Sequence, residues 1–259
     1  MNQQNKIALI TGAAKRVGRV IALQMAAAGW DIAIHYGKSK QDALGVISQI
    51  EDMGCRVIGI EADLQDPEEV KKILPECVAR LGLPDCLINN AALFEYDEPS
   101  AFQSDLLNAH MQINVAAPLI LSEQLYQLHA AQTSPKEPAV IIHLLDQKLD
   151  NLNPDFFSYT MSKAALEAAM KMQALHFAPK LRVVGVAPGI TMISGDQSAS
   201  SFQQAHQMTP LQRSSSPEDI AQGILYVCSA KAMTGTTLQI DGGQHLFGSR
   251  RDVMFLTNE

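Results

Sequence analysis

Residues 7–18 read I-A-L-I-T-G-A-A-K-R-V-G, a short apolar run followed by a glycine-rich turn and the start of a helical pattern. Gly12 and Gly18 flank the turn, and Arg16 stands where many such turns have a middle glycine. A turn that opens a helix aims backbone N–H groups and the positive end of the helix dipole at one point. The stretch therefore predicts a phosphate-binding turn between the first strand and the first helix.

Short apolar runs alternate with helical patterns along the rest of the chain. Runs typical of buried strands cover residues 7–10, 32–34, 57–60, 86–88, 140–142, 183–186 and 237–240. Helical patterns cover residues 17–28, 40–52, 67–81, 101–130, 157–178 and 217–230, and Gly29 is expected to cap the first helix in a left-handed conformation. This alternation predicts an α/β fold, a doubly wound parallel sheet of about seven strands with helices on both faces. We expect residues 1–259 to form a single domain, because no linker or repeat divides the sequence.

Composition excludes several classes of function. The 259 residues carry 20 Lys and Arg against 27 Asp and Glu, a formal charge of -7, whereas nucleic-acid binding requires an excess of cations on one face. Residues 1–6 are polar and the first apolar run is short, so we expect no secretory signal, no membrane span and a cytoplasmic location. The four cysteines are widely spaced without a C-x-x-C pair, which favours reduced, buried thiols and no metal site.

Ligands of such sheets bind beyond the carboxyl ends of the strands, near the point where the strand order reverses. Residues 35–39, after the second run, read H-Y-G-K-S, with a cation and a hydroxyl but no acid. An acid at this place accepts a hydrogen bond from the ribose 2′-OH of NADH, so Lys38 and Ser39 favour a 2′-phosphate and hence NADPH. The alternative is that Lys38 only decorates the start of the next helix.

Four polar residues are candidates for chemistry. Tyr159 and Lys163 share one face of a helix start, where an ammonium lowers the pKa of a phenol and the pair can protonate a carbonyl or imine. Asn114 lies among apolar neighbours, which favours a buried, hydrogen-bonded side chain over a solvent-facing one. Asp146 follows the fifth run and is expected beside Tyr159 at the sheet edge, either as a loop cap or as part of the site.

In combination, these motifs resemble the short-chain dehydrogenase/reductase family from about residue 6 to residue 247. The resemblance is carried by T-G-A-A-K-R-V-G (11–18), A-D-L (62–64), N-N-A (89–91), Asn114, Y-T-M-S-K (159–163), P-G-I-T (188–191) and D-G-G (241–243). It implies a seven-stranded Rossmann sheet and a homotetramer or homodimer. Residues 248–259 extend past the usual end of the family and are expected against a neighbouring subunit or partly disordered.

Two departures from the common family pattern are similar to the pteridine reductase and dihydromonapterin reductase branch. Asp146 occupies the place of the family's catalytic Ser, and Arg16 replaces the middle glycine. Phe94 matches that branch's aromatic residue that stacks on the pterin ring, and D-G-G-Q-H-L (241–246) is also similar. This implies NADPH-dependent hydride transfer to a C=N carbon of a dihydropterin, with Tyr159 and Asp146 delivering the proton. Asp146 opposes Lys163 by raising the phenol pKa, so we expect these groups to titrate as a coupled unit.

The resemblance assigns the site residues to three groups, and none of them is a metal ligand. The catalytic residues are Asn114, Asp146, Tyr159 and Lys163. The cofactor-binding residues are Gly12, Lys15, Arg16, Val17, Gly18, Tyr36, Lys38, Ser39, Asp63, Leu64, Asn90, Ala91, Lys163, Pro188, Gly189, Ile190 and Thr191. The substrate-binding residues are Arg16, Ala92, Phe94, Asp146 and Tyr159, and residues 192–212 are expected to form a lid.

Two other functions are consistent with the sequence. The first is a broad NADPH-dependent carbonyl reductase acting on an oxoacyl or other ketone, with Asp146 as an incidental substitution. The second is a non-catalytic NADP(H)-sensing protein, which the retention of Tyr159, Lys163 and Asn114 disfavours. In each case the expected partner is a small molecule, pterin or ketone, and not a nucleic acid or a membrane.

Overall fold

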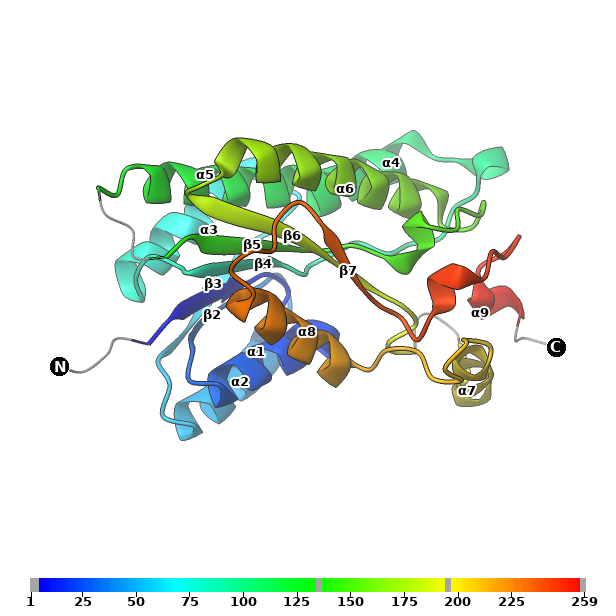
Figure 1. Ribbon diagram of the computed structural model, residues 1–259, viewed down its shortest axis with the longest axis horizontal. Coiled ribbons are helices and arrows are strands. Elements are labelled where there is room, and N and C mark those ends of the chain that lie inside the picture. Colours follow the sequence, from blue (N-terminus) through cyan, green and yellow to red (C-terminus); the bar gives the residue numbers. More distant parts are fainter. Residues whose placement is uncertain (1–4, 134–136, 194–196, 257–259) are drawn as a thin grey trace.

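The computed structural model describes residues 5–133, 137–193 and 197–256 (Figure 1). Its strands are β1 (Ile7–Ile10), β2 (Asp31–Tyr36), β3 (Val57–Glu61), β4 (Cys86–Asn89), β5 (Ala139–Leu144), β6 (Leu181–Pro188) and β7 (Thr237–Ile240). Its α-helices are α1 (Arg16–Ala27), α2 (Lys40–Asp52), α3 (Pro67–Arg80), α4 (Ser104–Met111), α5 (Ala117–Ala130), α6 (Phe157–Phe177), α7 (Ala199–Gln207), α8 (Pro217–Ser229) and α9 (Val253–Leu256). Short helical turns span Pro99–Ala101, Gln112–Ala116, Gln147–Leu149 and Gln244–Leu246.

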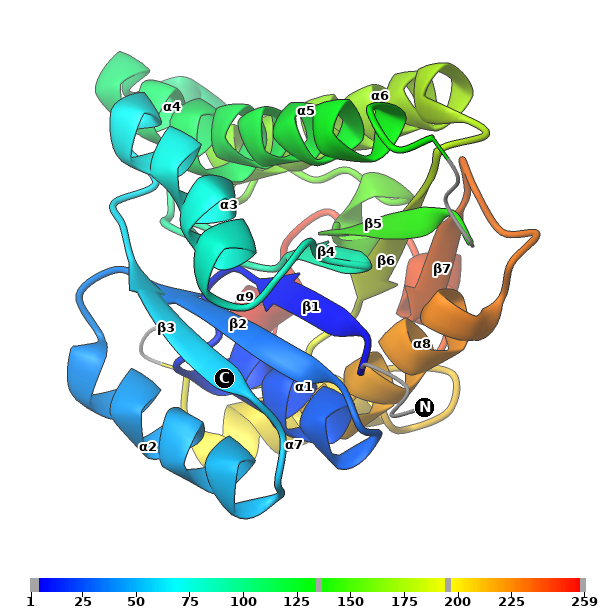
Figure 2. The same cartoon turned by 90° about the vertical axis from the view of Figure 1, so that its left-hand side faces the viewer.

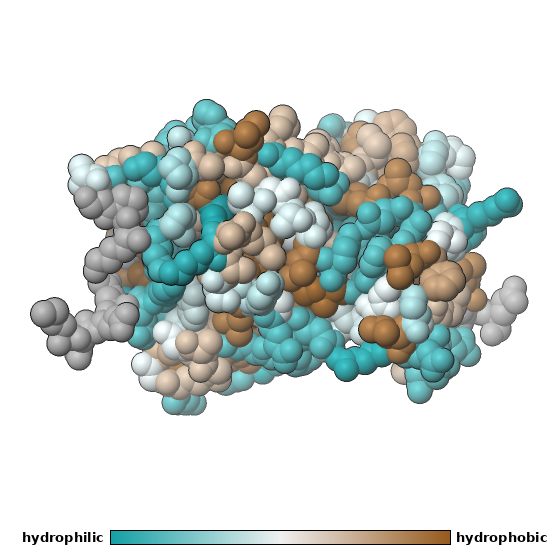
Figure 3. Space-filling model, in the orientation of Figure 1, coloured by the Kyte–Doolittle hydropathy of each residue, from teal (hydrophilic) through white to brown (hydrophobic). Residues whose placement is uncertain are grey.

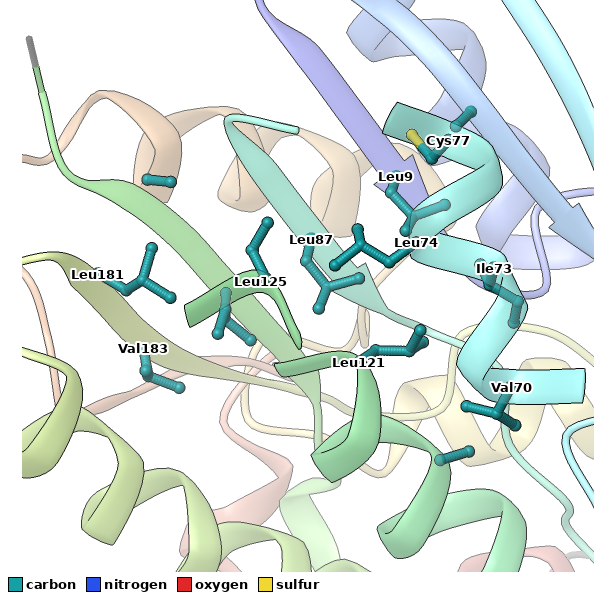
Figure 4. Close-up of a cluster of buried hydrophobic side chains, with 14 of the residues drawn as sticks. Leu9, Val70, Ile73, Leu74, Cys77, Leu87, Leu121, Leu125, Leu181 and Val183 are labelled. Carbon is teal, nitrogen blue, oxygen red and sulfur yellow. The ribbon is translucent and has the colours of Figure 1, made fainter. Parts of the chain in front are cut away.

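All seven strands form one parallel sheet in the order β3-β2-β1-β4-β5-β6-β7. Helices α1, α2 and α8 cover one face, and α3, α5 and α6 cover the other (Figures 1 and 2). Each face has its own core of buried aliphatic side chains, and Figure 4 shows the core beneath α3 and α5, where Leu9 and Leu87 meet Leu74 and Leu121. The α/β prediction of a doubly wound Rossmann sheet is confirmed. The strand order reverses between β1 and β4, and ligands of such sheets bind beyond the carboxyl ends of the strands at this point.

The helical pattern predicted at residues 101–130 is present as unbroken helix from Ser104 to Ala130, but the sequence did not predict a change of helix type in its middle. The structure divides it into α4, a widened π-helical turn at Gln112–Ala116, and α5. Pro118 has no N–H to donate to the carbonyl four residues back, at Asn114, so the ladder of backbone hydrogen bonds widens there. As a result, Asn114 lies in an irregular turn and its side chain is 1% exposed.

The described part of the C-terminal extension packs against its own chain, and residues 257–259 lie outside the described residues. Residues 250–256 include α9, and Asp252 forms an ion pair with Lys148, which follows β5. Helices α7 and α9 carry no strong sequence pattern and were not predicted. The expected lid at residues 192–212 contains helix α7, and its residues 194–196 lie outside the described part of the chain.

Hydrophobic residues on the face shown in Figure 3 are scattered among polar ones. Within the described residues, no helix has the length and apolar character needed to cross a membrane.

Two buried histidines lie at the carboxyl edge of the sheet in the neutral form. His35, in β2, accepts the backbone N–H of Gly12 at Nδ1 (3.2 Å), and its Nε2 donates to the carbonyl of Ala62 (3.1 Å). His143, in β5, contacts Asn89 and Gln173 through its two ring nitrogens. Burial lowers the pKa of each histidine to about 4, because the protonated ring would lose its hydration.

We expect these histidines to make the free energy of unfolding depend on pH. The unfolded chain binds protons at both positions below about pH 6.5, whereas the folded protein does not until about pH 4, so stability falls as the pH drops through this window. Between pH 8 and pH 5 each residue should cost on the order of 2 kcal/mol. Urea unfolding at several pH values should show a shallower pH slope for His35→Gln or His143→Gln than for the unmodified protein. His176→Gln, at an exposed position of α6, is the control for replacing a histidine outside the core.

Candidate active site

The turn after β1 is built for close contact between backbone segments. Gly12 has a φ of +64°, in the left-handed region that glycine adopts without strain. A Cβ at Gly18 would lie 2.2 Å from the carbonyl oxygen of Gly12, so only glycine allows the first turn of α1 to approach the loop. The first turn of α1 contains no acidic residue, and Lys15 at its N-cap makes no side-chain capping bond. The positive end of α1 is therefore directed at whatever the pocket holds.

The turn is fastened to the segment that follows β4. The Thr11 hydroxyl accepts the backbone N–H groups of Asn90 and Ala91, each at 3.0 Å. In return, the Asn90 side-chain amide donates to the carbonyls of Thr11 (2.8 Å) and Gly12 (3.2 Å). These bonds hold the N-N-A motif against the glycine-rich turn, at the point where the strand order reverses.

Arg16 is a non-glycine residue in a left-handed conformation. Its φ is +51°, so the position where many dinucleotide loops have glycine keeps the backbone geometry that favours glycine. An L-residue with a Cβ is strained there by about 1–2 kcal/mol. The Arg16 guanidinium donates to the carbonyl of Ile193 at 3.0 Å, which connects the turn to the segment after β6. Such strain is kept where the side chain serves a purpose that glycine cannot serve.

Asn114 acts on the site through other residues. Its side-chain oxygen accepts the backbone N–H of Leu93 (2.7 Å), and its amide donates to the Leu93 carbonyl (3.0 Å) and to the Ser162 hydroxyl (3.0 Å). It therefore joins the loop before Phe94 to the helix that carries Tyr159. Asn114 does not line the pocket, and in this structure it positions the residues that do.

Asp146 and Tyr159 form a hydrogen-bonded pair at the wall of the pocket. The Tyr159 hydroxyl donates to one carboxylate oxygen of Asp146 at 2.8 Å, and the backbone N–H of Lys148 donates to the other at 2.9 Å. Asp146 is thus both the cap of the turn Gln147–Leu149 and the partner of the tyrosine, so the two roles considered for it occur together. The Lys163 ammonium lies 5.6 Å from the centre of the Tyr159 ring and donates to the Leu144 carbonyl at 2.6 Å.

The proton in this cluster stays on the phenol. Burial, and then the charge of Asp146, raise the pKa of Tyr159 well above its usual value. Burial also raises the pKa of Asp146, although its hydrogen bonds and Lys163 oppose the change, and burial lowers the pKa of Lys163 to about 8. The expected lowering of the phenol pKa by Lys163 is therefore outweighed. At neutral pH Tyr159 is a hydrogen-bond donor and Asp146 is the acceptor that orients it.

These residues surround a pocket of about 450 Å³ at the carboxyl edge of the sheet. The residues that were predicted for the site and that line this pocket are Gly12, Lys15, Arg16, Val17, Gly18, Asn90, Ala91, Ala92, Phe94, Asp146, Tyr159, Gly189, Ile190 and Thr191. Those that lie outside its lining are Tyr36, Lys38, Ser39, Asp63, Leu64, Asn114, Lys163 and Pro188. Lys38 and Asp63 are exposed at the ends of β2 and β3, whereas Lys163 is buried behind Tyr159.

The pocket also contains residues that were not among the predicted site residues: Gln147, Lys148, Met192, Gln197, Gln244, Asp252, Val253 and Met254. Of these, Met192 and Gln197 belong to the expected lid at residues 192–212. Gln147 and Lys148 directly follow Asp146, a position that could have marked them. Gln244, within D-G-G-Q-H-L, accepts the backbone N–H of Ile190 at 3.1 Å and steadies the loop after β6. The C-terminal residues follow no motif, and only the folded chain brings them to the site.

Aromatic side chains form the outer wall. Phe94 stacks on Phe156 with ring centres 4.2 Å apart, and its ring meets that of Tyr159 edge-on at 4.7 Å. Phe94 nevertheless remains 41% exposed, so much of its ring is open to a ligand in the pocket.

Comparisons with known proteins agree with this geometry. A family sequence model described as enoyl-(acyl carrier protein) reductase matches residues 12–245. The 3-oxoacyl-(acyl-carrier-protein) reductase FabG of Staphylococcus aureus is 30% identical, over 94% of this chain and 100% of its own length. Pteridine reductase 1 of Leishmania tarentolae is 28% identical, over 93% of this chain and 96% of its own.

A solved structure is also similar along nearly its whole length. FolM alternative dihydrofolate reductase 1 from Brucella canis, crystallised in complex with NADP, matches with a TM-score of 0.87 and 30% sequence identity. The match covers 96% of this chain and 98% of that one. From the family match, the sheet order and the arrangement of Tyr159 and Lys163, the chain belongs to the short-chain dehydrogenase/reductase family.

Proposed function

We propose that this protein is an NADPH-dependent reductase of a dihydropterin, of the dihydrobiopterin, dihydromonapterin or dihydrofolate type. The observation that carries the proposal is the Asp146 carboxylate held against the Tyr159 hydroxyl, with the open ring of Phe94 beside it. A pterin presents ring and amino N–H donors as well as acceptors, so an anionic acceptor suits it better than a hydroxyl does. The similarity to a pteridine reductase and to FolM supports the same substrate class.

The residues of the pocket fit a dinucleotide cofactor. The N-terminal turn of α1, with Gly18 close to the Gly12 carbonyl, suits a pyrophosphate. Lys38 and Ser39, beyond the end of β2 where no acid stands, suit a 2′-phosphate, and Ser39 makes no capping bond that would engage its hydroxyl. The NADP complex of the structural neighbour supports this choice. When bound, the cofactor supplies a hydride from its nicotinamide ring.

The side chains of the chain would orient and protonate the substrate. Phe94 would stack on the substrate ring. Phe156 covers part of the Phe94 ring, and the rest of it faces the pocket. Asp146 would accept N–H donors of the pterin, and Tyr159 would donate its proton, directly or through a water, to the ring nitrogen that becomes basic. Lys163 would replace the proton that Tyr159 gives up, since the Lys163 pKa of about 8 lies close to neutral pH.

A second candidate is an NADPH-dependent reductase of a 3-oxoacyl or other ketone. The 30% identity to a 3-oxoacyl-(acyl-carrier-protein) reductase supports it. A ketone has only an acceptor oxygen at the reacting centre, so the Asp146 carboxylate would offer it no hydrogen bond and Tyr159 alone would serve it. Asp146 is therefore the residue that separates the two candidates.

We expect the purified protein to consume NADPH with a dihydropterin. The measurement is the decrease of NADPH absorbance with dihydrobiopterin, dihydromonapterin and dihydrofolate, beside a panel of ketones that includes a 3-oxoacyl thioester. Ketone reduction without turnover of any pterin would reject the leading proposal in favour of the second. NADPH binding without turnover of any compound would favour a sensing protein.

Asp146→Ser should lower kcat/KM for the pterin by about 10- to 100-fold, the effect of losing a hydrogen bond to a charged group. Any ketone reduction should change less, because a ketone does not use the carboxylate. Asp150→Ser, at an exposed position just after the same turn, is the matched control and should leave both activities close to normal. Equal losses on pterin and ketone would remove Asp146 from substrate recognition.

Arg16→Gly should be more stable than Arg16→Ala, and both variants should weaken ligand binding. Relief of the left-handed strain should make the glycine variant about 1 kcal/mol more stable than Arg16→Ala, since both variants lose the guanidinium and only alanine keeps the strain. Both variants should bind NADPH or the pterin less tightly than the unmodified protein. Urea unfolding and fluorescence titration measure the two effects. Equal stability of the two variants would contradict the strain argument, and unchanged affinities would contradict the ligand contact.

A further inference from the structure

The C-terminal segment 250–256 folds back onto the start of α6. Arg251 donates from Nε to the Asp155 carboxylate (2.8 Å to Oδ2), and the backbone N–H of Asp252 donates to the same oxygen at 2.7 Å. Asp155 is 1% exposed, so these bonds replace its hydration. Phe255 packs against the rings of Tyr96 (5.4 Å) and Phe156 (6.1 Å), which extends the aromatic wall that Phe94 begins.

Asp252 reaches from this segment to a lysine of the pocket. Its carboxylate lies 2.9 Å from the ammonium of Lys148, whose side chain is only 4% exposed, and Asp252 itself is 21% exposed. The ring of Phe156 lies 5.3 Å from the same ammonium. A buried ammonium needs a counter-charge, and among the described residues Asp252 forms the ion pair with Lys148.

Lys148 also contacts the catalytic pair, through its backbone. Its N–H donates to the Asp146 oxygen that Tyr159 does not use. A lysine two residues after a carboxylate can turn its own ammonium toward that carboxylate unless another anion holds it. In this structure Asp252 is the anion that holds it.

The other charged groups around the pair are accounted for. Lys163 lies on the far side of Tyr159 and donates to the Leu144 carbonyl, while Arg16 points toward Ile193. His110, with its ring 6.3 Å from that of Tyr159, donates to the Leu106 carbonyl and accepts the Glu95 N–H, so both ring nitrogens are engaged. The charge of Asp155 also acts on Lys148, but the Asp155 carboxylate is already held by Arg251 and by the backbone N–H of Asp252. Lys148 and Asp252 are therefore the charges whose pairing can change at Asp146.

We propose that the C-terminal segment is part of the active site, and that Asp252 is a positioning residue that holds the Lys148 ammonium away from Asp146. Asp146 then stays free to accept hydrogen bonds from Tyr159 and from a substrate. Val253 and Met254, which line the pocket beside Asp252, close its outer side with apolar surface. The inference rests on the proposed reductase function, because it assigns a role to this segment in that reaction.

The charges predict the direction of the effect. Burial raises the pKa of Asp146, and the Asp252 carboxylate adds to that rise, as it does for Tyr159. Replacing Asp252 by Asn removes a nearby negative charge and releases the Lys148 ammonium toward Asp146. Both changes lower the pKa of Asp146, because both favour its carboxylate form.

The test compares three variants in the full-length protein. The pH profile of kcat/KM is measured with NADPH and whichever compound is turned over. In Asp252→Asn, the fall of kcat/KM on the acid side should move to lower pH by about half a unit or more. At neutral pH, kcat/KM should be lower than in the unmodified protein, because the Lys148 ammonium then pairs with the Asp146 carboxylate. Asp252→Glu keeps the charge and should restore the original pH profile. Arg251→Gln loosens the same segment but keeps the Asp252 carboxylate beside Lys148, so it should raise KM and leave the profile in place. A shift of the profile in Arg251→Gln equal to that in Asp252→Asn would reduce Asp252 to an anchor and overturn its positioning role.

A second measurement needs no turnover, so it separates failure of this inference from failure of the proposed function. The side-chain carboxyl of Asp146 is followed by carbon NMR in protein labelled at aspartate, with the signal assigned from its loss in Asp146→Ser. The titration midpoint should be lower in Asp252→Asn than in the unmodified protein and in Asp252→Glu. An unchanged midpoint overturns the proposal whatever the substrate is. A lower midpoint with an unchanged pH profile overturns the role of the Lys148–Asp252 pair in the reaction.

Discussion

The hydrogen bonds between Thr11 and the Asn90–Ala91 backbone are the constraint on which the site depends. They extend the pairing of β1 and β4 beyond the ends of the strands, where the chain leaves the sheet in opposite directions. Because the strand order reverses at this point, a groove opens between the two exits, and the bonds set its width. His35 supports the same turn from the other side by accepting the Gly12 N–H, and it does so as a neutral ring. The glycine-rich turn after β1 is thus held from β2 and from β4 at once.

Local sequence was enough to predict the sheet and most of its helices. The runs 7–10 and 237–240 coincide with β1 and β7, and the left-handed cap at Gly29 is present with a φ of +84°. These features depend on neighbouring residues, through apolar periodicity and the conformational freedom of glycine. The π-helical turn at Asn114 was not predicted, because a single proline inside an apolar stretch leaves the periodicity almost intact while it removes one backbone donor.

The site could be predicted only where chemistry follows a motif. Asp146 was expected beside Tyr159 because it follows the fifth strand and Tyr159 begins the next helix. The structure brings the two side chains to hydrogen-bonding distance. Lys148 and Asp252 are 104 residues apart, and neither belongs to a periodic pattern. Their pairing depends on where Asp155 and Phe156 anchor the end of the chain, which is a property of the folded surface. Sequence order carries no signal for such a contact.

The arrangement of charges in the pocket has a chemical logic that the Tyr-Lys motif alone does not convey. With Lys163 turned to the Leu144 carbonyl, the closest charged neighbour of the phenol is the Asp146 carboxylate, so the pair favours a protonated tyrosine and an anionic acceptor. Such a pair can donate one hydrogen bond and accept others at adjacent atoms. A ketone oxygen needs only the donor, whereas a ring with neighbouring N–H and imine nitrogens needs both. Under the proposed function, the Asp146 carboxylate serves a nitrogen heterocycle, and Asp252, by pairing with the Lys148 ammonium, keeps that acceptor available.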